Sequence, residues 1–315
     1  MRNRTDMTDD AISAVLRLAD VESVASGGFT AGGDWAIRFP PPDKIKFFAA
    51  VRGESWLKMD DEAEPRRLVS GDVVLLVTAT GFVISSDPQR EAVLAHSLFA
   101  DRTDPIVTAG GGDDVLMIGG HVRVHPTYAS MLSDALPSVI HVHGTAPEAQ
   151  RMRWVLEGLV EESHGDLPGS GMASTQLAHL LFIQILRAHL ATGESLKTGW
   201  LRAAADPRLG IVLRHMHGDP AKPWRLEQLA SMAAMSRTVF ASQFKAAVGV
   251  APLAYLARWR MRLAEHALRR GDVPVAVLAR DLGYASESAF SHAFKRLVGM
   301  PPSRYADARA GQSPQ

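Results

Sequence analysis

The last third of the chain contains one sequence pattern twice, and this duplication most constrains the fold. Phe240 and Tyr255 in the first copy match Phe290 and Tyr305 in the second, with an offset of 50 at both positions (290 − 240 and 305 − 255). At the Leu-Ala pair that opens each copy the offset is 49, so the second copy has one extra residue in its turn. Two copies are too few for a solenoid, so the pattern indicates a duplicated module.

Each copy predicts a short helix, a tight turn and a second helix. In the second copy Leu278 belongs to an apolar helix face, Gly283 interrupts that helix, and Ser286 is a candidate N-cap for the next one. Phe290 and Phe294 follow at helical spacing. The second helix of such a unit can lie in a DNA major groove. The two helix-turn-helix motifs are predicted at residues 226–247 and 275–297.

A longer helix is predicted between the two copies, from Pro252 to Arg270. Proline suits the first helical turn, and Gly271 is a candidate C-cap behind two arginines. A rigid connecting helix would fix the spacing of the two recognition helices. Helices about 34 Å apart meet successive major grooves on one face of B-DNA.

Polar side chains that point away from the paired phenylalanines are the candidate DNA contacts. The candidate phosphate contacts are Arg237, Lys245, Lys295 and Arg296. The candidate base-reading residues are Thr238, Ser242, Gln243, Glu287, Ser288, Ser291 and His292. Charge supports this interpretation, because residues 222–315 hold 14 Lys and Arg against 6 Asp and Glu, whereas the whole chain holds 34 of each.

Residues 222–309 resemble the DNA-binding domain of the AraC/XylS family of bacterial transcription regulators. The resemblance is carried by Trp224-x-Leu226-Glu227-x-Leu229-Ala230, Met235-Ser236-Arg237, Phe244-Lys245, Gly249-x-x-Pro252, Trp259-Arg260-Met261, Gly283-Tyr284-x-Ser286-Glu287-Ser288-Ala289-Phe290 and Phe294-Lys295-Arg296. It implies binding to double-stranded promoter DNA and contact with RNA polymerase. Ser242 stands where the family often has a long basic side chain, and Ala241 beside it offers no side-chain hydrogen bond, so base reading by the first copy should be thin.

The N-terminal part changes to a strand pattern after a predicted helix over residues 10–24. Further short strands are predicted at residues 35–39, 44–51, 55–59, 72–78, 82–85, 115–118, 121–124 and 139–143. Many short strands with regular turns are typical of a β-sandwich or a jelly-roll barrel. The chain as a whole is therefore predicted to be α+β.

This region resembles the cupin-type N-terminal domain of one branch of the same family. The likeness lies in Trp35-x-Ile37-x-Phe39, Phe47-Phe48, Leu68-x-x-Gly71-Asp72-Val73-Val74-Leu75-Leu76 and Leu136-Pro137. It implies a barrel that senses a small molecule or an environmental signal and mediates pairing. Barrel mouths are common ligand sites, and the candidate lining residues are Trp35, Phe48, Trp56 and Phe82, with plain core packing as the alternative.

Histidine placement argues against the standard cupin metal site. Metal-dependent members carry histidines on strands near Phe47-Phe48 and Gly81-Phe82, and this chain has none there. His141 and His143 share a strand face, and His121 and His125 would share one if their strand is regular. We expect packed or barrel-edge histidines and no metal or other cofactor, with these four as the candidates if a metal binds.

Two helices are predicted at residues 148–164 and 172–190. The second is apolar nearly all round, with Leu181 and Phe182 at its centre, so most of its faces must be covered. Either these helices form the interface of a homodimer, or they pack on the chain's own barrel.

The expected domains are a barrel (1–145), a helical linker (146–210), a DNA-binding domain (211–309) and a disordered tail (310–315). Cysteine is absent, which excludes disulfides and thiolate chemistry and fits a reducing cytoplasm. No apolar run is long enough to span a membrane, and residues 1–10 do not form a signal peptide. We expect a cytoplasmic transcription regulator that is not an enzyme and is controlled by an unidentified small-molecule effector. The alternatives are a metal-dependent cupin enzyme with an appended helical domain, or a constitutive regulator whose barrel only dimerises.

Overall fold

The computed structural model describes residues 10–100, 104–164, 167–192, 196–271 and 273–310. The chain forms two units, one made of Asp20–Leu196 and the other of Met1–Ala19 with Lys197–Gln315. These boundaries differ from the expected ones at residues 145 and 210, because the two helices after the barrel pack on it and the first helix packs with the C-terminal helices. The expected tail lies outside the described residues after Ala310.

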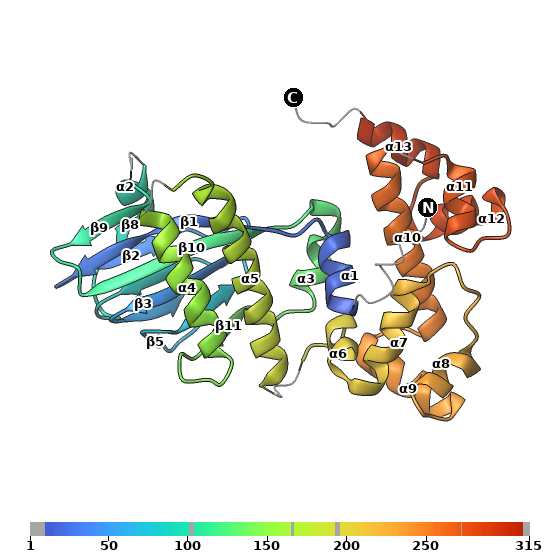
Figure 1. Cartoon of the computed structure of the whole chain (residues 1–315), viewed down its shortest axis with the longest axis horizontal. Coiled ribbons are helices and arrows are strands. Elements are labelled where there is room, and N and C mark those ends of the chain that lie inside the picture. The colour runs from blue at the N-terminus through green and yellow to red at the C-terminus, as the bar shows by residue number, and fades with distance from the viewer. Residues whose placement is uncertain (1–9, 101–103, 165–166, 193–195, 272, 311–315) are drawn as a thin grey trace. The chain divides into compact units, whose positions relative to one another are not determined.

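Two β-sheets form the N-terminal unit, as the cupin resemblance implied (Figure 1). The six-stranded sheet has the order β11-β6-β3-β10-β1-β9, and the five-stranded sheet has the order β5-β4-β7-β2-β8. The strands of the larger sheet are β1 (Glu22–Gly32), β3 (Ile45–Arg52), β6 (Val73–Leu76), β9 (Ile106–Gly110), β10 (Val115–Arg123) and β11 (Val139–Val142). Those of the smaller sheet are β2 (Ala36–Phe39), β4 (Glu54–Met59), β5 (Arg66–Val69), β7 (Phe82–Ser85) and β8 (Val93–Leu94). Their inward apolar side chains form one core.

The first strand corrects the prediction of a helix over residues 10–24. Helix α1 (Ala11–Leu18) ends early, and β1 then pairs with both β10 and β9. The glycines of β1 conceal this strand in the sequence, because glycine lowers strand propensity. They are required here, since a Cβ on Gly28 would lie 2.1 Å from the carbonyl oxygen of Met117 in β10.

Helices α4 (Ala149–His164) and α5 (Ser170–Ala191) belong to the barrel unit. Helix α5 packs against α4, β1 and β11, and Leu181 and Phe182 are both 0% exposed. The chain's own barrel unit therefore covers Leu181 and Phe182, the two residues that had suggested a dimer interface. The short helices of this unit are α2 (Ala95–Phe99), η2 (Pro126–Tyr128) and α3 (Ala129–Ser133).

Helices alone form the second unit within the described residues. After α1 they are α6 (Trp200–Ala205), α7 (Pro207–Gly218), α8 (Leu226–Met232), α9 (Arg237–Val248), α10 (Pro252–Arg270), α11 (Val275–Asp281), α12 (Glu287–Val298) and α13 (Pro302–Ala310). The long helix α10 has the bounds expected from Pro252 and Gly271. In the described part of the chain no single helix is long and apolar enough to cross a membrane, although α9 and α10, bent by 49°, meet that test as a pair.

Candidate nucleic-acid interface and barrel pocket

The two helix-turn-helix copies begin their second helices in the same way. Ser236 caps α9 by accepting a hydrogen bond from the backbone N–H of Val239 at 3.4 Å. Ser286 caps α12 by accepting one from Ala289 at 3.1 Å. A serine hydroxyl satisfies a backbone donor that a helix start otherwise leaves unpaired, so each cap fixes where its helix begins.

Paired aromatic side chains then fix which face of each helix is buried. The ring centroids of Phe240 and Phe244 lie 5.7 Å apart in α9, and those of Phe290 and Phe294 lie 5.7 Å apart in α12. All four rings are 0% exposed. Each second phenylalanine also meets the edge of a tyrosine ring, at 5.8 Å in the first copy and 5.6 Å in the second. Because the buried faces correspond, the outward faces correspond too.

The outward face of α9 is polar, but two of its side chains already have partners. The candidate contacts Arg237, Thr238, Ser242, Gln243 and Lys245 are all exposed. Arg237 forms an ion pair with Glu227 of α8, with 2.8 Å between Nη1 and Oε1. This hydrogen bond lowers the pKa of the Glu227 carboxyl. Gln243 accepts a longer hydrogen bond, of 3.4 Å, from Arg208 of α7.

The outward face of α12 gathers its two basic side chains at the C-terminal end of the helix. Glu287, Ser288, His292, Lys295 and Arg296 are exposed, and Ser291 is half-buried. His292, Lys295 and Arg296 line a surface hollow together with two alanines of the same helix. Lys295 and Arg296 also lie in the last turn of the helix, where positive charge is favourable. The structure therefore brings three of the six predicted second-copy contacts, His292, Lys295 and Arg296, to one surface hollow.

The turns of the two copies differ where the sequences differ. Ala234 ends the first turn with φ 52°, a left-handed conformation that is unfavourable for a residue with a side chain. Gly283 occupies the same place in the second turn with φ 76°, and a Cβ there would lie 2.0 Å from the carbonyl oxygen of Ala221. The second turn therefore requires glycine for two reasons, whereas the first tolerates alanine.

A buried polar group that the sequence analysis did not single out supports the first copy. His217 of α7 stacks on Trp259 at 3.8 Å between ring centroids, and its Nε2 is 2.8 Å from the Tyr255 hydroxyl. Burial lowers the pKa of His217 to about 3, so the ring is neutral at pH 7. Burial also raises the pKa of the Tyr255 hydroxyl.

The barrel contains a pocket of about 390 Å³ between its sheets. Phe48 and Phe82, two of the four predicted lining residues, belong to its wall. Trp35 and Trp56 are not among the described lining residues. Trp35 packs edge-on against Phe29 in the core, and Trp56 points to the outer face of its strand because the flanking residues are buried.

The polar residues of the pocket wall were not predicted from the sequence. Lys46, half-buried on β3, and His96, on α2, line the wall together with Ser26. Burial lowers the pKa of Lys46, Lys44 adds to this effect, and Asp43 opposes it. The Lys46 ammonium lies 5.6 Å from the Phe39 ring centroid. The apolar run of β3 placed Lys46 on a strand but did not show that its neighbourhood is a cavity.

The candidate histidines separate into two groups. The Nδ1 of His121 is 3.0 Å from the Ser26 hydroxyl, and burial, with help from Lys44, lowers the pKa of the ring. His125 follows the end of β10 and caps η2, so it does not share a regular strand face with His121. His141 and His143 do lie together, and both approach Asp72.

Comparisons with known proteins match both units. A cupin family model matches residues 10–191, and a helix-turn-helix domain model matches residues 229–308. A putative AraC-like transcription regulator of Streptomyces lividans is 40% identical over 296 residues, which is 94% of this chain and 97% of that protein. The transcriptional regulator AlkR of Acinetobacter baylyi is 32% identical over 284 residues, covering 87% and 91% of the two chains. Among solved structures, the DNA-binding domain of AdpA in complex with a target DNA is 31% identical to this chain, with a TM-score of 0.33. The match covers 35% of this chain and 98% of the AdpA domain.

Proposed function

Because the chain belongs to the AraC family of DNA-binding transcriptional regulators and carries the cupin-type N-terminal domain, we propose that α9 and α12 make its DNA contacts. The observation that carries this proposal is the shared framework of the two copies. Matching caps and matching buried phenylalanines leave corresponding polar faces exposed on two helices joined by α10. Such helices can enter successive major grooves.

The two copies have different roles in this proposal. Lys295, Arg296 and Lys245 contact phosphates, and Arg237 does so once it leaves Glu227. On α12 the bases are read by Ser288 and His292, with Glu287 and Ser291 beside them. On α9 the short side chains Thr238 and Ser242, with Gln243, read fewer bases. The second copy therefore supplies most of the sequence specificity.

Binding to the DNA upstream of the protein's own gene tests this assignment. In the variant Ser288→Ala/His292→Ala we expect affinity for the specific site to fall about tenfold to a hundredfold. Affinity for random DNA should stay the same, because phosphate contacts remain. Fluorescence anisotropy across a salt series measures both. Equal losses on specific and random DNA, or no loss on either, would contradict a base-reading role.

The barrel pocket is the proposed effector site. Its wall is mostly apolar and aromatic, with Phe39 stacked on Phe82 at 4.8 Å and Phe48 stacked on Phe82 at 5.7 Å between ring centroids. Lys46 adds one partly desolvated ammonium, for which no salt bridge partner is found among the described residues. An apolar ring with one acidic group matches this wall, because the anion offsets the burial of the ammonium.

A matched pair of neutral and acidic probes tests the pocket chemistry. We expect 2-naphthoate to bind more tightly than its isosteric amide in the wild-type chain, as measured by calorimetry. Lys46→Met should remove this preference and leave binding of the amide unchanged. Lys58→Met is the matched control, because Lys58 lies exposed on β4 outside the pocket wall. A preference that persists without Lys46 would refute its role.

Four further assignments belong to this proposal. We assign the barrel a regulatory and not a catalytic role, because the similar proteins are named as transcription regulators. We assign the protein to the cytoplasm, because a regulator of this family acts on chromosomal DNA. Contact with RNA polymerase and the homodimer stay predictions. The homodimer no longer has Leu181 and Phe182 as support, so the molar mass in solution is the measurement that decides it.

A further inference from the structure

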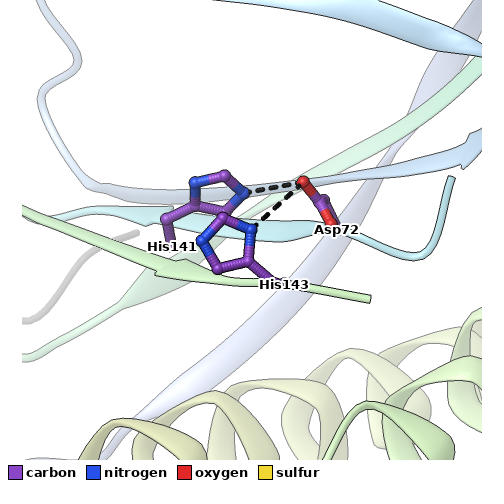
Figure 2. Close-up of side chains that lie close together, drawn as sticks. All are labelled: Asp72, His141 and His143. Carbon is purple, nitrogen blue, oxygen red and sulfur yellow. Dashed lines mark hydrogen bonds and ion pairs between the residues drawn. The ribbon is translucent and has the colours of Figure 1, made fainter. Parts of the chain in front are cut away.

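Three potential metal ligands meet at one edge of the larger sheet (Figure 2). Asp72 lies directly before β6, and His141 and His143 lie on β11 and directly after it. Strand β11 pairs antiparallel with β6, with Val142 opposite Val73, so this register brings Asp72 next to both histidines. The sequence showed the two imidazoles on one face but not the carboxylate, which lies 69 residues before His141.

The spacing of the three groups suits a tetrahedral ion. The Oδ2 of Asp72 is 2.8 Å from the Nε2 of His141 and 3.8 Å from the Nδ1 of His143. The three ligand atoms all lie within 4.8 Å of one another. In a zinc site with bonds of about 2.0–2.1 Å, ligand atoms lie about 3.3 Å apart. Each of the two distances from Asp72 differs from this value by about half an ångström, and the two imidazole nitrogens lie within 4.8 Å of each other.

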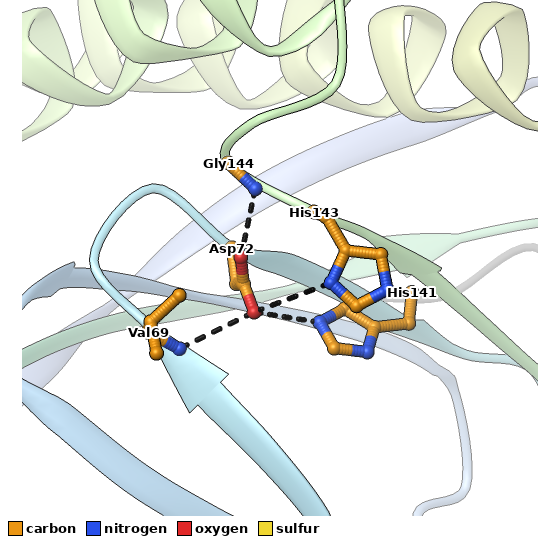
Figure 3. Close-up of polar contacts among 5 residues, drawn as sticks. All are labelled: Val69, Asp72, His141, His143 and Gly144. Atoms are coloured by element: carbon orange, nitrogen blue, oxygen red, sulfur yellow. Dashed lines mark hydrogen bonds and ion pairs between the residues drawn. The ribbon is translucent and has the colours of Figure 1, made fainter.

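The carboxylate is held in place by the backbone around it (Figure 3). Asp72 is 2% exposed, and its Oδ1 accepts a hydrogen bond of 2.7 Å from the backbone N–H of Gly144. Its Oδ2 accepts one of 3.2 Å from Val69. The group is therefore an oriented anion, like carboxylates that are positioned by hydrogen bonds in metal sites.

His143 distinguishes a metal site from a simple buried hydrogen bond. The contact between Asp72 and His141 by itself only ties β11 to the turn before β6. That contact does not require the second imidazole, yet the ring centroids of His143 and His141 lie 4.1 Å apart. The His143 side chain is 66% exposed, so the cluster is buried on the carboxylate side and open to water on the other.

We propose that Asp72 Oδ2, His141 Nε2 and His143 Nδ1 bind a divalent transition metal ion, Zn²⁺ first, with water as the fourth ligand. Two imidazoles and one carboxylate form a donor set typical of zinc. Binding replaces the hydrogen bond between Asp72 and His141 by bonds to the ion, with the proton of His141 on its other ring nitrogen. The cluster shares no residue with the described wall of the barrel pocket, so the ion tightens the sheet edge and takes no part in effector binding.

Zinc binding to the full chain, with any affinity tag removed, tests the site independently of DNA binding. Calorimetry with ZnCl₂ should give one ion per chain with a dissociation constant of about 10 μM or lower. His143→Ala should weaken binding at least about tenfold. This exposed side chain can be removed with little effect on folding, whereas Asp72 is buried. His215→Ala is the control, an exposed histidine outside both the cluster and the pocket wall.

Two further readouts separate the metal site from a structural contact. Zinc should raise the melting temperature of the wild-type chain and of His215→Ala, but not that of His143→Ala. Cobalt substitution should give the visible absorption of a tetrahedral ion, and His143→Ala should abolish it. No stoichiometric zinc in the wild-type chain, or equal zinc binding in His143→Ala, would overturn the proposal.

Discussion

The two helix-turn-helix copies share a buried framework and differ in almost everything exposed. Phe240 and Phe244 in one copy and Phe290 and Phe294 in the other are 0% exposed. Outside this framework both copies present a matching lysine, Lys245 or Lys295. The first copy adds short side chains and an arginine engaged with Glu227, whereas the second adds Ser288, His292 and Arg296. The two copies thus share the packing that positions the second helix, while their outward-facing residues differ, so we expect them to contribute differently to DNA binding.

The largest expected difference between the copies is in the turns. Gly283→Ala should lower the free energy of unfolding by about 3 kcal/mol or more, because the new Cβ would overlap the Ala221 carbonyl oxygen and the residue would be held at φ 76°. At the matching position Ala234→Gly should change stability by less than about 1 kcal/mol, because relief of strain offsets the added freedom of the unfolded chain. Urea unfolding measures both. Equal effects at the two turns would show that the structural difference is unimportant.

The stability of the region around the first copy should depend on pH through His217. Its pKa is lowered from 6.5 to about 3 in the folded chain, so the unfolded chain binds the extra proton between these values. The folded chain is therefore not penalised by this histidine above pH 6.5. As the pH falls below 6.5 the unfolding free energy decreases, and the loss reaches about 2 kcal/mol at pH 5.

His217→Phe removes this titration, so the unfolding free energy of the variant should depend less on pH between 6.5 and 5 than that of the wild type. Chemical unfolding at several pH values measures the two slopes, which are independent of any constant loss of stability from the missing Tyr255 contact. Parallel slopes would contradict the assignment.

Phosphate binding should differ between the copies by about one contact. Lys295→Ala/Arg296→Ala should flatten the slope of log affinity against log salt by about 1.8, since each lost phosphate contact contributes about 0.9. Lys245→Ala in the first copy should change the slope by about half as much. Anisotropy titrations on random DNA measure the slopes. A greater change from Lys245→Ala would make the first copy the main electrostatic anchor.

The smallest expected effect concerns the ion pair between Arg237 and Glu227. Both side chains are well exposed, so the pair contributes little to stability. Glu227→Gln should release Arg237 toward a phosphate and raise DNA affinity about twofold at low salt, with the gain disappearing at high salt. Arg237→Ala should abolish the effect of Glu227→Gln. A gain that persists without Arg237 would place its cause elsewhere.

The sequence predicted the helical unit more closely than the barrel. The bounds of α10 followed from Pro252 and Gly271, and the cap Ser286 from its place between Gly283 and the next apolar helix face. These signals are local, because residues three or four apart share a helix face. Strand β1 escaped prediction because its glycines serve a contact with β10 about 90 positions later, and nothing in its own residues reports that contact.

The candidate DNA contacts were likewise predicted more closely from the sequence than the residues of the barrel pocket. The exposed positions on α9 and α12 followed from helical periodicity, although Ser291 is half-buried and Arg237 is paired. In the barrel, aromatic residues alone did not identify the pocket wall, because strand alternation turned Trp56 outward and core packing enclosed Trp35. Lys46 could have been recognised only as a charged residue on an otherwise buried strand.

By itself the sequence determined the duplicated module, the helix caps, the divided charge and the polar faces of the recognition helices, because helical contacts depend on near neighbours. Tertiary structure alone decided that α5 is covered by its own barrel, that Lys46 reaches a cavity, and that Asp72 joins His141 and His143. Those outcomes depend on strand register and layer packing, which join residues far apart in the chain. No local pattern encodes such pairs, since the same residue types occur in strands whose neighbours are different.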